Sequence, residues 1–233
     1  MKARLLLGLF FASLAFNIMR ITGPVDWRMI AAPLAGWWFA DFLSGLVHMW
    51  MDCRPCVADD ALKELHAWVG SRASDAFMAR QAEVYDGLKT FERIHVAFKK
   101  HHVTPDVVGH LPLFHLIKAP TFFSALPMSL ALNVVVLFWR SPGWALLGAV
   151  IFLLGGSLTA YFHSVLHRAQ PPWPIRLMRA LHLLMNPATH KAHHATMWRD
   201  FGVISGWSNP VLNPIVGVLR RTGVLDEAAL VTG

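Results

Sequence analysis

The chain has 233 residues, of which 55% are hydrophobic and only 15% are charged, and its formal net charge at pH 7 is +7. This composition is typical of a membrane protein, and the length suits one domain over residues 1–233. No basic soluble domain is present, so the positive charge is better explained by membrane topology than by binding to nucleic acid.

Long apolar segments predict membrane spans. The four segments are 5–19, 29–50, 116–139 and 144–166. The last three reach the roughly 20 apolar residues that a helical span requires, whereas the first is short. The first segment follows Lys2 and Arg4 as in a signal peptide, but no clear cleavage site follows it, so we expect a retained helix. The sequence thus predicts an all-α integral membrane protein with about four transmembrane helices.

Glycines in or beside the fourth segment predict a close approach between helices. They are Gly143, Gly148, Gly155 and Gly156.

The distribution of Lys and Arg predicts the orientation of the spans. With four spans, 17 basic residues fall on the side that carries the 53–110 loop and the segment after residue 167, and 3 fall on the other side. Cytoplasmic loops are enriched in Lys and Arg, so this loop is predicted to be cytoplasmic. We expect a multi-pass protein of a bacterial inner membrane or an endoplasmic-reticulum-type membrane.

Shorter amphipathic segments lie between and after the predicted spans. Helical spacing of apolar residues in 59–99 predicts two surface helices, which either lie on the membrane or cap a metal site. A proline-rich turn at 171–174 precedes an expected short helix at 175–184. The apolar segment 211–219 is too short to span and predicts a re-entrant or interfacial piece.

The histidines are the strongest functional signal. All thirteen fall on or near the predicted cytoplasmic side. His163 and His167 are four residues apart and share a helical face, and 190–194 could present three imidazoles from one short helix. Neutral imidazole is a common ligand for iron, zinc and copper, so these groups predict a site for more than one metal ion.

Other polar residues have less specific interpretations. Asp41 lies inside a predicted span, where an acidic side chain is costly, and we expect it to bond a neighbouring helix or a ligand imidazole. His66 and His95 are interpreted as packing residues, and His115 and His182 are left open between packing and metal binding. The pair Cys53 and Cys56 is weak evidence for a redox or metal role, since a reducing cytoplasm disfavours a disulfide.

Four motifs in chain order resemble those of the Kua/CarF-type lipid desaturases, which include plasmanylethanolamine desaturases and the plant plastidial palmitate trans-desaturase. They are 40–48 with Asp52, 98–105 with His110, 162–167, and 190–194 with 203–209. The resemblance covers about 40–215. The chain departs from it at Met197-Trp198, where the family often has Pro-His, and after His110, at positions that concern the substrate rather than the metal core.

The resemblance implies a membrane lipid desaturase that uses O2 and two iron ions held mainly by histidine. The implied catalytic and metal residues are His48, Asp52, His101, His102, His110, His163, His167, His190, His193 and His194. The lipid would be an ether lipid desaturated to a vinyl ether, or a phospholipid acyl chain. No flavin, haem or iron–sulfur motif is present in the sequence, so electrons would come from a separate donor, either cytochrome b5-like or ferredoxin-like.

Three other functions remain open from the sequence. A lipid hydroxylase could use the same residues, and metal analysis would separate a zinc hydrolase. A metal transporter or a metal-dependent assembly factor is the alternative outside enzymes, but a transporter should carry its ligands near the bilayer midplane.

Overall fold

The computed structural model describes residues 2–230, and throughout this range the chain is helical or irregular, without a strand. The membrane-facing helices are α1 (Lys2–Met19), α2 (Arg28–Cys53), α7 (Leu113–Pro120), the π-helical turn η1 (Thr121–Ala125), α8 (Leu126–Phe138) and α9 (Gly143–Leu166). The remaining helices are α3 (Asp59–His66), α4 (Asp75–Asp86), α5 (Thr90–Lys100), α6 (Pro105–Gly109), α10 (Trp173–Ala180), α11 (Pro187–Thr196), α12 (Asn209–Arg221) and the 3-10 turn η2 (Glu227–Ala229).

Three segments are long and apolar enough to cross a membrane, and they correspond to the last three of the four expected spans. They are Arg28–Cys53, Leu113–Phe138 and Gly143–Leu166. The expected first span is an apolar helix, but α1 is shorter than the other three. It packs along α8, with the Ser13 and Ser129 hydroxyls 2.6 Å apart in a buried interhelical hydrogen bond. The structure therefore supports a membrane protein with three spans by length and one additional apolar helix.

The candidate span Leu113–Phe138 contains a π-helical turn. Pro120 ends α7 and cannot donate a backbone hydrogen bond, and Pro127 lies in the first turn of α8. Proline removes a backbone hydrogen bond from a helix, and the single π-turn η1 follows Pro120 directly. The segment α7–η1–α8 thus remains continuous.

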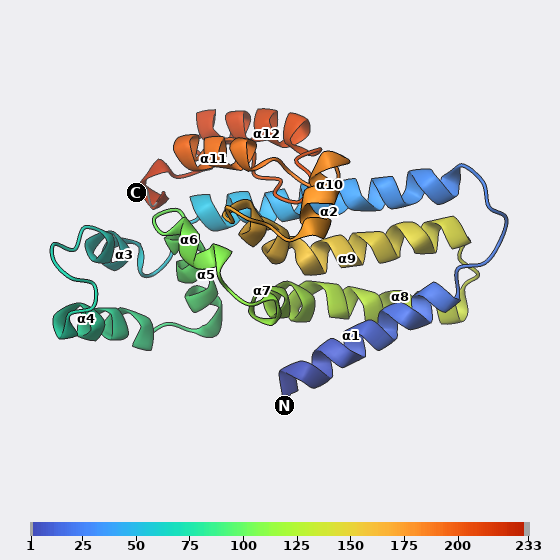
Figure 1. Ribbon diagram of the computed structural model, residues 1–233, viewed down its shortest axis with the longest axis horizontal. Coiled ribbons are helices and arrows are strands. Elements are labelled where there is room, and N and C mark those ends of the chain that lie inside the picture. Colours follow the sequence, from blue (N-terminus) through green and yellow to red (C-terminus); the bar gives the residue numbers. More distant parts are fainter. Residues whose placement is uncertain (1, 231–233) are drawn as a thin grey trace.

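Helices α2 and α9 form the centre of the bundle, running side by side in Figure 1. Gly36 lies on the backbone of Gly148, and a Cβ added at Gly155 would come within 2.8 Å of the Ala40 Cβ. The expectation of close approach is confirmed at Gly148 and Gly155. Gly143 instead contacts the backbone of the loop before α2, and Gly156 faces open space.

The 59–99 segment forms three helices, not the predicted two. Gly70 has φ +121°, a conformation that disfavours other residues, and it separates α3 from α4. Gly87 then ends α4 before α5 begins. The three helices lie beyond the C-terminal end of α2 (Figure 1).

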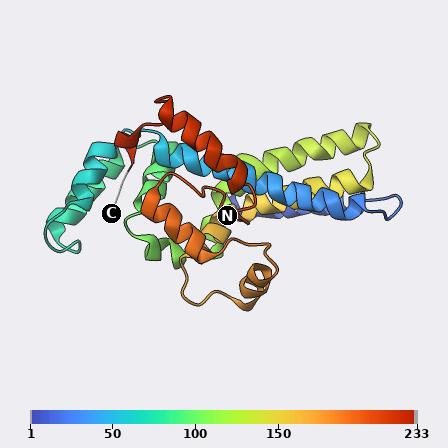
Figure 2. The same cartoon turned by 90° about the horizontal axis from the view of Figure 1, so that it is seen from above.

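The C-terminal segment covers the C-terminal half of α2. Figures 1 and 2 show α11 and α12 lying beside that half. The predicted helix at 175–184 is shorter than expected and ends at Ala180, because His182 adopts φ +56°. The predicted 211–219 piece is a helix of 13 residues, and Val216 packs with Met49 and Cys53 of α2.

Candidate metal centre

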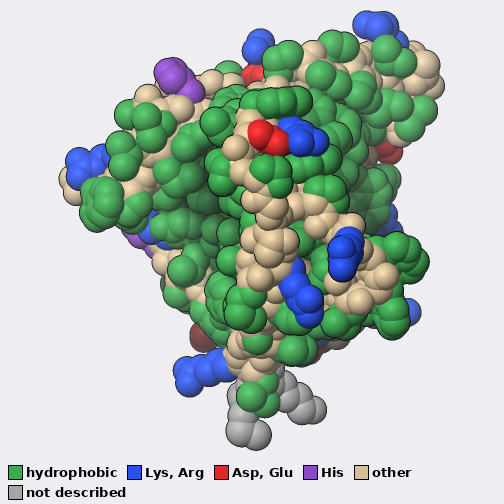
Figure 3. Space-filling model, turned by 90° about the vertical axis from the view of Figure 1, so that its right-hand side faces the viewer, with side chains coloured by type: hydrophobic (Ala, Val, Ile, Leu, Met, Phe, Trp, Pro, Cys, Tyr) green, Lys and Arg blue, Asp and Glu red, His purple; other side chains and the backbone are tan. Residues whose placement is uncertain are grey.

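Nine of the ten predicted ligand residues come together at one end of the bundle. His48 and Asp52 lie in the last turns of α2, and His163 and His167 lie at the end of α9. The remaining residues follow α5 or belong to α11. They are His101, His102, His190, His193 and His194. The opposite end of the bundle, seen in Figure 3, is mostly apolar, with histidine only at its margin.

The first group consists of five imidazoles. Its members, whose nitrogens lie within 4.8 Å of one another, are His101, His163, His167, His190 and His194. The Nε2 of His190 lies 3.0 Å from that of His163, 3.1 Å from that of His167 and 3.1 Å from that of His194. An imidazole nitrogen has one proton or one lone pair, so these three contacts cannot all be hydrogen bonds.

A shared cation would account for this convergence. Two nitrogens bound to one ion at about 2.1 Å and about 90° apart lie about 3.0 Å from each other, which is the spacing around His190. The five imidazoles therefore fit a metal ion.

The second group combines three imidazoles with one carboxylate. Its members are His48, Asp52, His102 and His193. The Asp52 Oδ1 lies 2.8 Å from the His102 Nε2, and its Oδ2 lies 3.2 Å from the His48 Nε2 and 3.4 Å from the His193 Nε2. Three imidazoles that surround one buried carboxylate form a second candidate metal site.

The two groups adjoin each other because neighbouring residues contribute to different groups. The rings of His101 and His102 are 4.0 Å apart between centroids, and those of His102 and His194 are 4.5 Å apart. The structure thus places two candidate ion sites side by side.

Backbone carbonyls orient several of these imidazoles. The Nδ1 of His48 lies 3.0 Å from the Phe201 carbonyl oxygen, and that of His193 lies 2.7 Å from the Arg199 carbonyl oxygen. The His101 Nδ1 contacts the Phe98 carbonyl in the same way. A carbonyl only accepts, so each Nδ1 carries the proton and each Nε2 keeps its lone pair. All three Nε2 atoms are buried without a hydrogen-bond partner, as metal ligands should be.

Burial keeps four of the imidazoles outside the spans neutral. It lowers the pKa of His101 and His190 well below the ordinary value, and nearby imidazoles lower both further. Burial is also the main cause that lowers the pKa of His167 to about 4 and that of His194 to about 2. Neutral imidazole is the form that binds metal.

Asp41 supports the site through a loop, not through the helix or imidazole that the sequence suggested. This carboxylate lies halfway along α2 and is fully buried. It accepts hydrogen bonds from the backbone N–H groups of residues 204, 205, 206 and 208 and from the Ser208 hydroxyl. The loop that carries the Phe201 carbonyl is thereby fixed against α2.

His110 differs from the other predicted ligands. Its side chain is exposed at the end of α6 and lies outside both groups. The short α6 helix ends just before it and leaves its side chain facing outward.

A third group is smaller and lies apart from the two histidine groups. It consists of Cys56, Glu92 and His95. The Cys56 thiol donates to Asp59, and burial raises the pKa of the thiol to about 11, which disfavours the thiolate that binds metal. The His95 Nε2 lies 2.8 Å from the Met51 carbonyl oxygen, in agreement with its interpretation as a packing residue.

Sequence reasoning did not find the supporting carbonyls of Phe98, Arg199 and Phe201. Any residue can supply a carbonyl, so no residue type signals this role. Asp52, in contrast, carries a local signal, because it lies one helical turn after His48.

The fold and the site define a helical membrane protein with a histidine-rich candidate metal centre at one end of its bundle. The sequence model of the lipid desaturase domain matches residues 87–222, more than half of the chain. The chain therefore belongs to the lipid desaturase family.

One relative is the plasmanylethanolamine desaturase of Myxococcus xanthus, which is 25% identical over 194 residues. The alignment covers 81% of this chain and 57% of that relative, so the chain spans little more than half of the relative's length. No solved structure matches the chain.

Proposed function

We propose that the protein is an O2-dependent lipid desaturase that uses two iron ions. Its substrate would be the alkyl chain of an ether lipid, converted to a vinyl ether, or the acyl chain of a phospholipid. The observation that carries the proposal is the pair of adjoining ligand groups, one with five imidazoles and one with three imidazoles and Asp52.

The donor set fits iron in a redox role. Imidazole with a single carboxylate is a common donor set for iron. With O2 and two electrons, a bound iron pair would supply the oxidant that removes two hydrogens from adjacent carbons. The balance is one lipid CH2–CH2 unit, O2, two electrons and two protons giving one CH=CH unit and two waters.

The chain's own contribution is to position ligands and exclude water. His48, His190 and His193 are at most 3% exposed, so competing water has little access to their nitrogens. The carbonyls of Phe201 and Arg199 hold the proton on Nδ1 and aim Nε2 inward. The site lies at the ends of α2 and α9, where a lipid chain in the bilayer and a cytoplasmic electron donor could both reach it.

The electron donor would be a separate redox protein, either cytochrome b5-like or ferredoxin-like. The orientation with the site toward the cytoplasm rests on the Lys and Arg distribution. Cysteine labelling at positions 103 and 142 tests it: position 103 should react only after the membrane is opened, and position 142 should react on intact cells.

Lipid analysis tests the activity. A deletion strain should lack vinyl-ether or additional olefinic lipids, which return when the wild-type chain is expressed but not when His190→Ala is expressed. New hydroxylated lipids, with no new double bond, would instead identify a hydroxylase. Unchanged lipids in all three strains would contradict the proposal.

A further inference from the structure

The third group of possible ligands joins the segment after α2 to helix α5. One atom from each of its three side chains lies within 4.8 Å of the other two, namely the Cys56 Sγ, a Glu92 oxygen and a His95 nitrogen. His95 is fully buried, and Glu92 and Cys56 are partly buried. The group therefore brings an imidazole, a carboxylate and a thiol together outside the two histidine groups.

The imidazole and the carboxylate of this group face each other with lone pairs. The His95 Nε2 lies 2.8 Å from the Met51 carbonyl oxygen, and a carbonyl only accepts, so Nε2 carries the proton and Nδ1 keeps its lone pair. Burial lowers the pKa of His95, which disfavours a second proton on the ring. The Nδ1 lies 3.9 Å from the Glu92 Oε2, and within residues 2–230 both buried atoms are without a hydrogen-bond partner. Two buried acceptors in this position require a positive or donating group between them.

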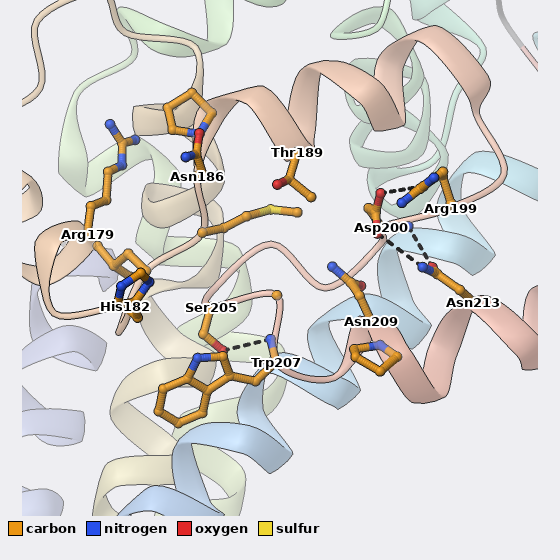
Figure 4. Close-up of a pocket in the computed structure, with 15 residues that line it drawn as sticks. Arg179, His182, Asn186, Thr189, Arg199, Asp200, Ser205, Trp207, Asn209 and Asn213 are labelled. Atoms are coloured by element: carbon orange, nitrogen blue, oxygen red, sulfur yellow. Dashed lines mark hydrogen bonds and ion pairs between the residues drawn. The ribbon is translucent and has the colours of Figure 1, made fainter.

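Another carboxylate of the chain provides a comparison. Asp200 lines the polar cavity drawn in Figure 4, where it pairs with Arg199 at 2.6 Å and accepts from the Asn213 amide at 3.1 Å. Both of its oxygens are therefore satisfied by neighbouring side chains. In Glu92 only Oε1 has a cationic neighbour, the Arg54 guanidinium at 3.6 Å, and no group of the described chain donates to Oε2.

Cys56 offers the third donor atom. Its thiol donates to the Asp59 carboxylate at 3.0 Å, and burial keeps it protonated by raising its pKa to about 11. A bound cation reverses this preference, because a thiol that coordinates a metal ion is deprotonated outright. The proton would be released to water. A divalent ion with one thiolate and one carboxylate then has no net charge, which favours binding in a buried place.

The donor set favours zinc. Thiolate, imidazole and carboxylate are the three kinds of side chain that bind zinc in proteins, and the sulfur distinguishes this group from the two groups proposed to bind iron. Zinc–ligand bonds of about 2.0–2.3 Å at tetrahedral angles put ligand atoms about 3.3–3.6 Å apart. The distance of 3.9 Å between the His95 Nδ1 and the Glu92 Oε2 is thus close to that of two ligands on one ion.

The position of the group connects it to the histidine centre. Helix α5 carries Glu92 and His95 and ends immediately before His101 and His102, one in each ligand group. Met51, whose carbonyl orients His95, immediately precedes Asp52. An ion held by the third group would therefore join the two elements that lead into both iron sites.

We propose that Cys56, Glu92 and His95 form a zinc site that joins α5 to the end of α2 and steadies the segment that carries His101 and His102. The proposal does not depend on the lipid activity. Structural zinc sites usually have four protein ligands, and this one has three and must release a thiol proton. We therefore expect it to fill when zinc is supplied and to lose zinc during purification in zinc-free buffer.

Equilibrium dialysis of the iron-loaded protein in detergent against micromolar free zinc tests the site. Elemental analysis should find one additional zinc per chain, with the iron content unchanged. Cobalt in place of zinc identifies the sulfur ligand, because a cobalt–thiolate bond gives near-ultraviolet charge-transfer absorption that imidazole and carboxylate ligands do not give. Zinc should also slow amide hydrogen exchange in residues 90–102 severalfold, since the ion ties α5 to α2.

Two variants remove single ligands, each with a matched control. Cys56→Ser should abolish the cobalt–thiolate absorption and weaken zinc binding at least about tenfold. Its control is Cys53→Ala, because Cys53 packs against Met49 and Val216 and is not part of the group. Glu92→Gln should weaken zinc binding to the same degree and keeps the test valid if Cys56→Ser does not fold. Its control is Glu83→Gln, on an exposed side chain of α4.

Three results would overturn the proposal. If the wild type takes up no additional zinc, a water molecule bridges Glu92 and His95 instead. Zinc uptake that is matched by iron loss, or that is equal in Cys56→Ser, Glu92→Gln and their controls, would place the zinc in the histidine groups. Zinc binding without slower exchange in residues 90–102 would contradict the role in joining α5 to α2. Unchanged lipids in the deletion strain would contradict only the proposed function and leave the zinc site in place.

Discussion

The two ligand groups differ in charge and in how they are held. The five-imidazole group has no carboxylate and converges on the Nε2 of His190. The other group surrounds Asp52, and two of its imidazoles are fixed by carbonyls of the segment after α11. The difference indicates that metal binding in the five-imidazole group would depend on the number of ligands. Metal binding in the Asp52 group would depend on the carboxylate and on the loop that orients its imidazoles.

Removing one central ligand from each group should have the largest effects. His190→Ala and His193→Ala should each lower desaturation at least ~100-fold, since even loss of a supporting group costs about 10–100-fold in metal affinity or activity. Each variant should also retain about one iron fewer than the wild type. Mass spectrometry of lipids and elemental analysis check both statements at matched protein amounts. Full activity in His193→Ala would show that the second group is not part of the site.

Asp52→Asn should affect only the second group. It keeps the size of the side chain but removes the negative charge that faces three imidazoles, so metal affinity should fall about 10–100-fold at one of the two sites. During dialysis against a chelator, the variant should lose one ion early and the other at the wild-type rate. Metal analysis of samples taken over time measures both losses. Equal loss of both ions would mean that the groups do not hold metal independently.

Asp41→Asn tests whether the second group depends on its loop. Oδ1 accepts three backbone N–H groups and Oδ2 accepts from Ser208, so an amide nitrogen at the Oδ2 position would face donors. We expect a loss of about 3 kcal/mol in the free energy of unfolding and weaker metal retention in the His48 group. Asp26→Asn, in an exposed pair with Arg28, is the control and should stay within about 0.5 kcal/mol. A thermal unfolding temperature unchanged in Asp41→Asn would contradict this role.

His110→Gln should have the smallest effect. The resemblance implied a metal ligand at this position, but the side chain is exposed and outside both groups. Activity should stay within about twofold of the wild type, whereas a loss as large as in His190→Ala would place His110 at the metal in the working enzyme. The same lipid assay measures it.

The sequence predicted the helical membrane fold and most of the residues of the candidate metal centre. Both predictions depend on local properties, namely the length of the apolar segments and the i, i+4 spacing of His163 and His167. Nine of the ten predicted ligand residues fall in the two groups. The three long apolar helices and the shorter first one agree with the sequence, and the number of helices that cross a membrane stays a prediction. The prediction was wrong in the number of surface helices, since Gly70 and Gly87 divide 59–99 into three.

The parts that sequence could not supply depend on contacts between distant segments. Asp41 accepts hydrogen bonds from a loop more than 160 residues away in the sequence. His101 and His102 are neighbours in the sequence but belong to different groups, because the position of each group depends on where α2, α9 and α11 meet.

Elemental analysis of the detergent-purified wild-type protein is the most direct test of the central claim. The account predicts two irons per chain and no stoichiometric zinc, because two adjoining ligand groups are present and both suit iron. One zinc per chain with no iron would contradict the desaturase proposal.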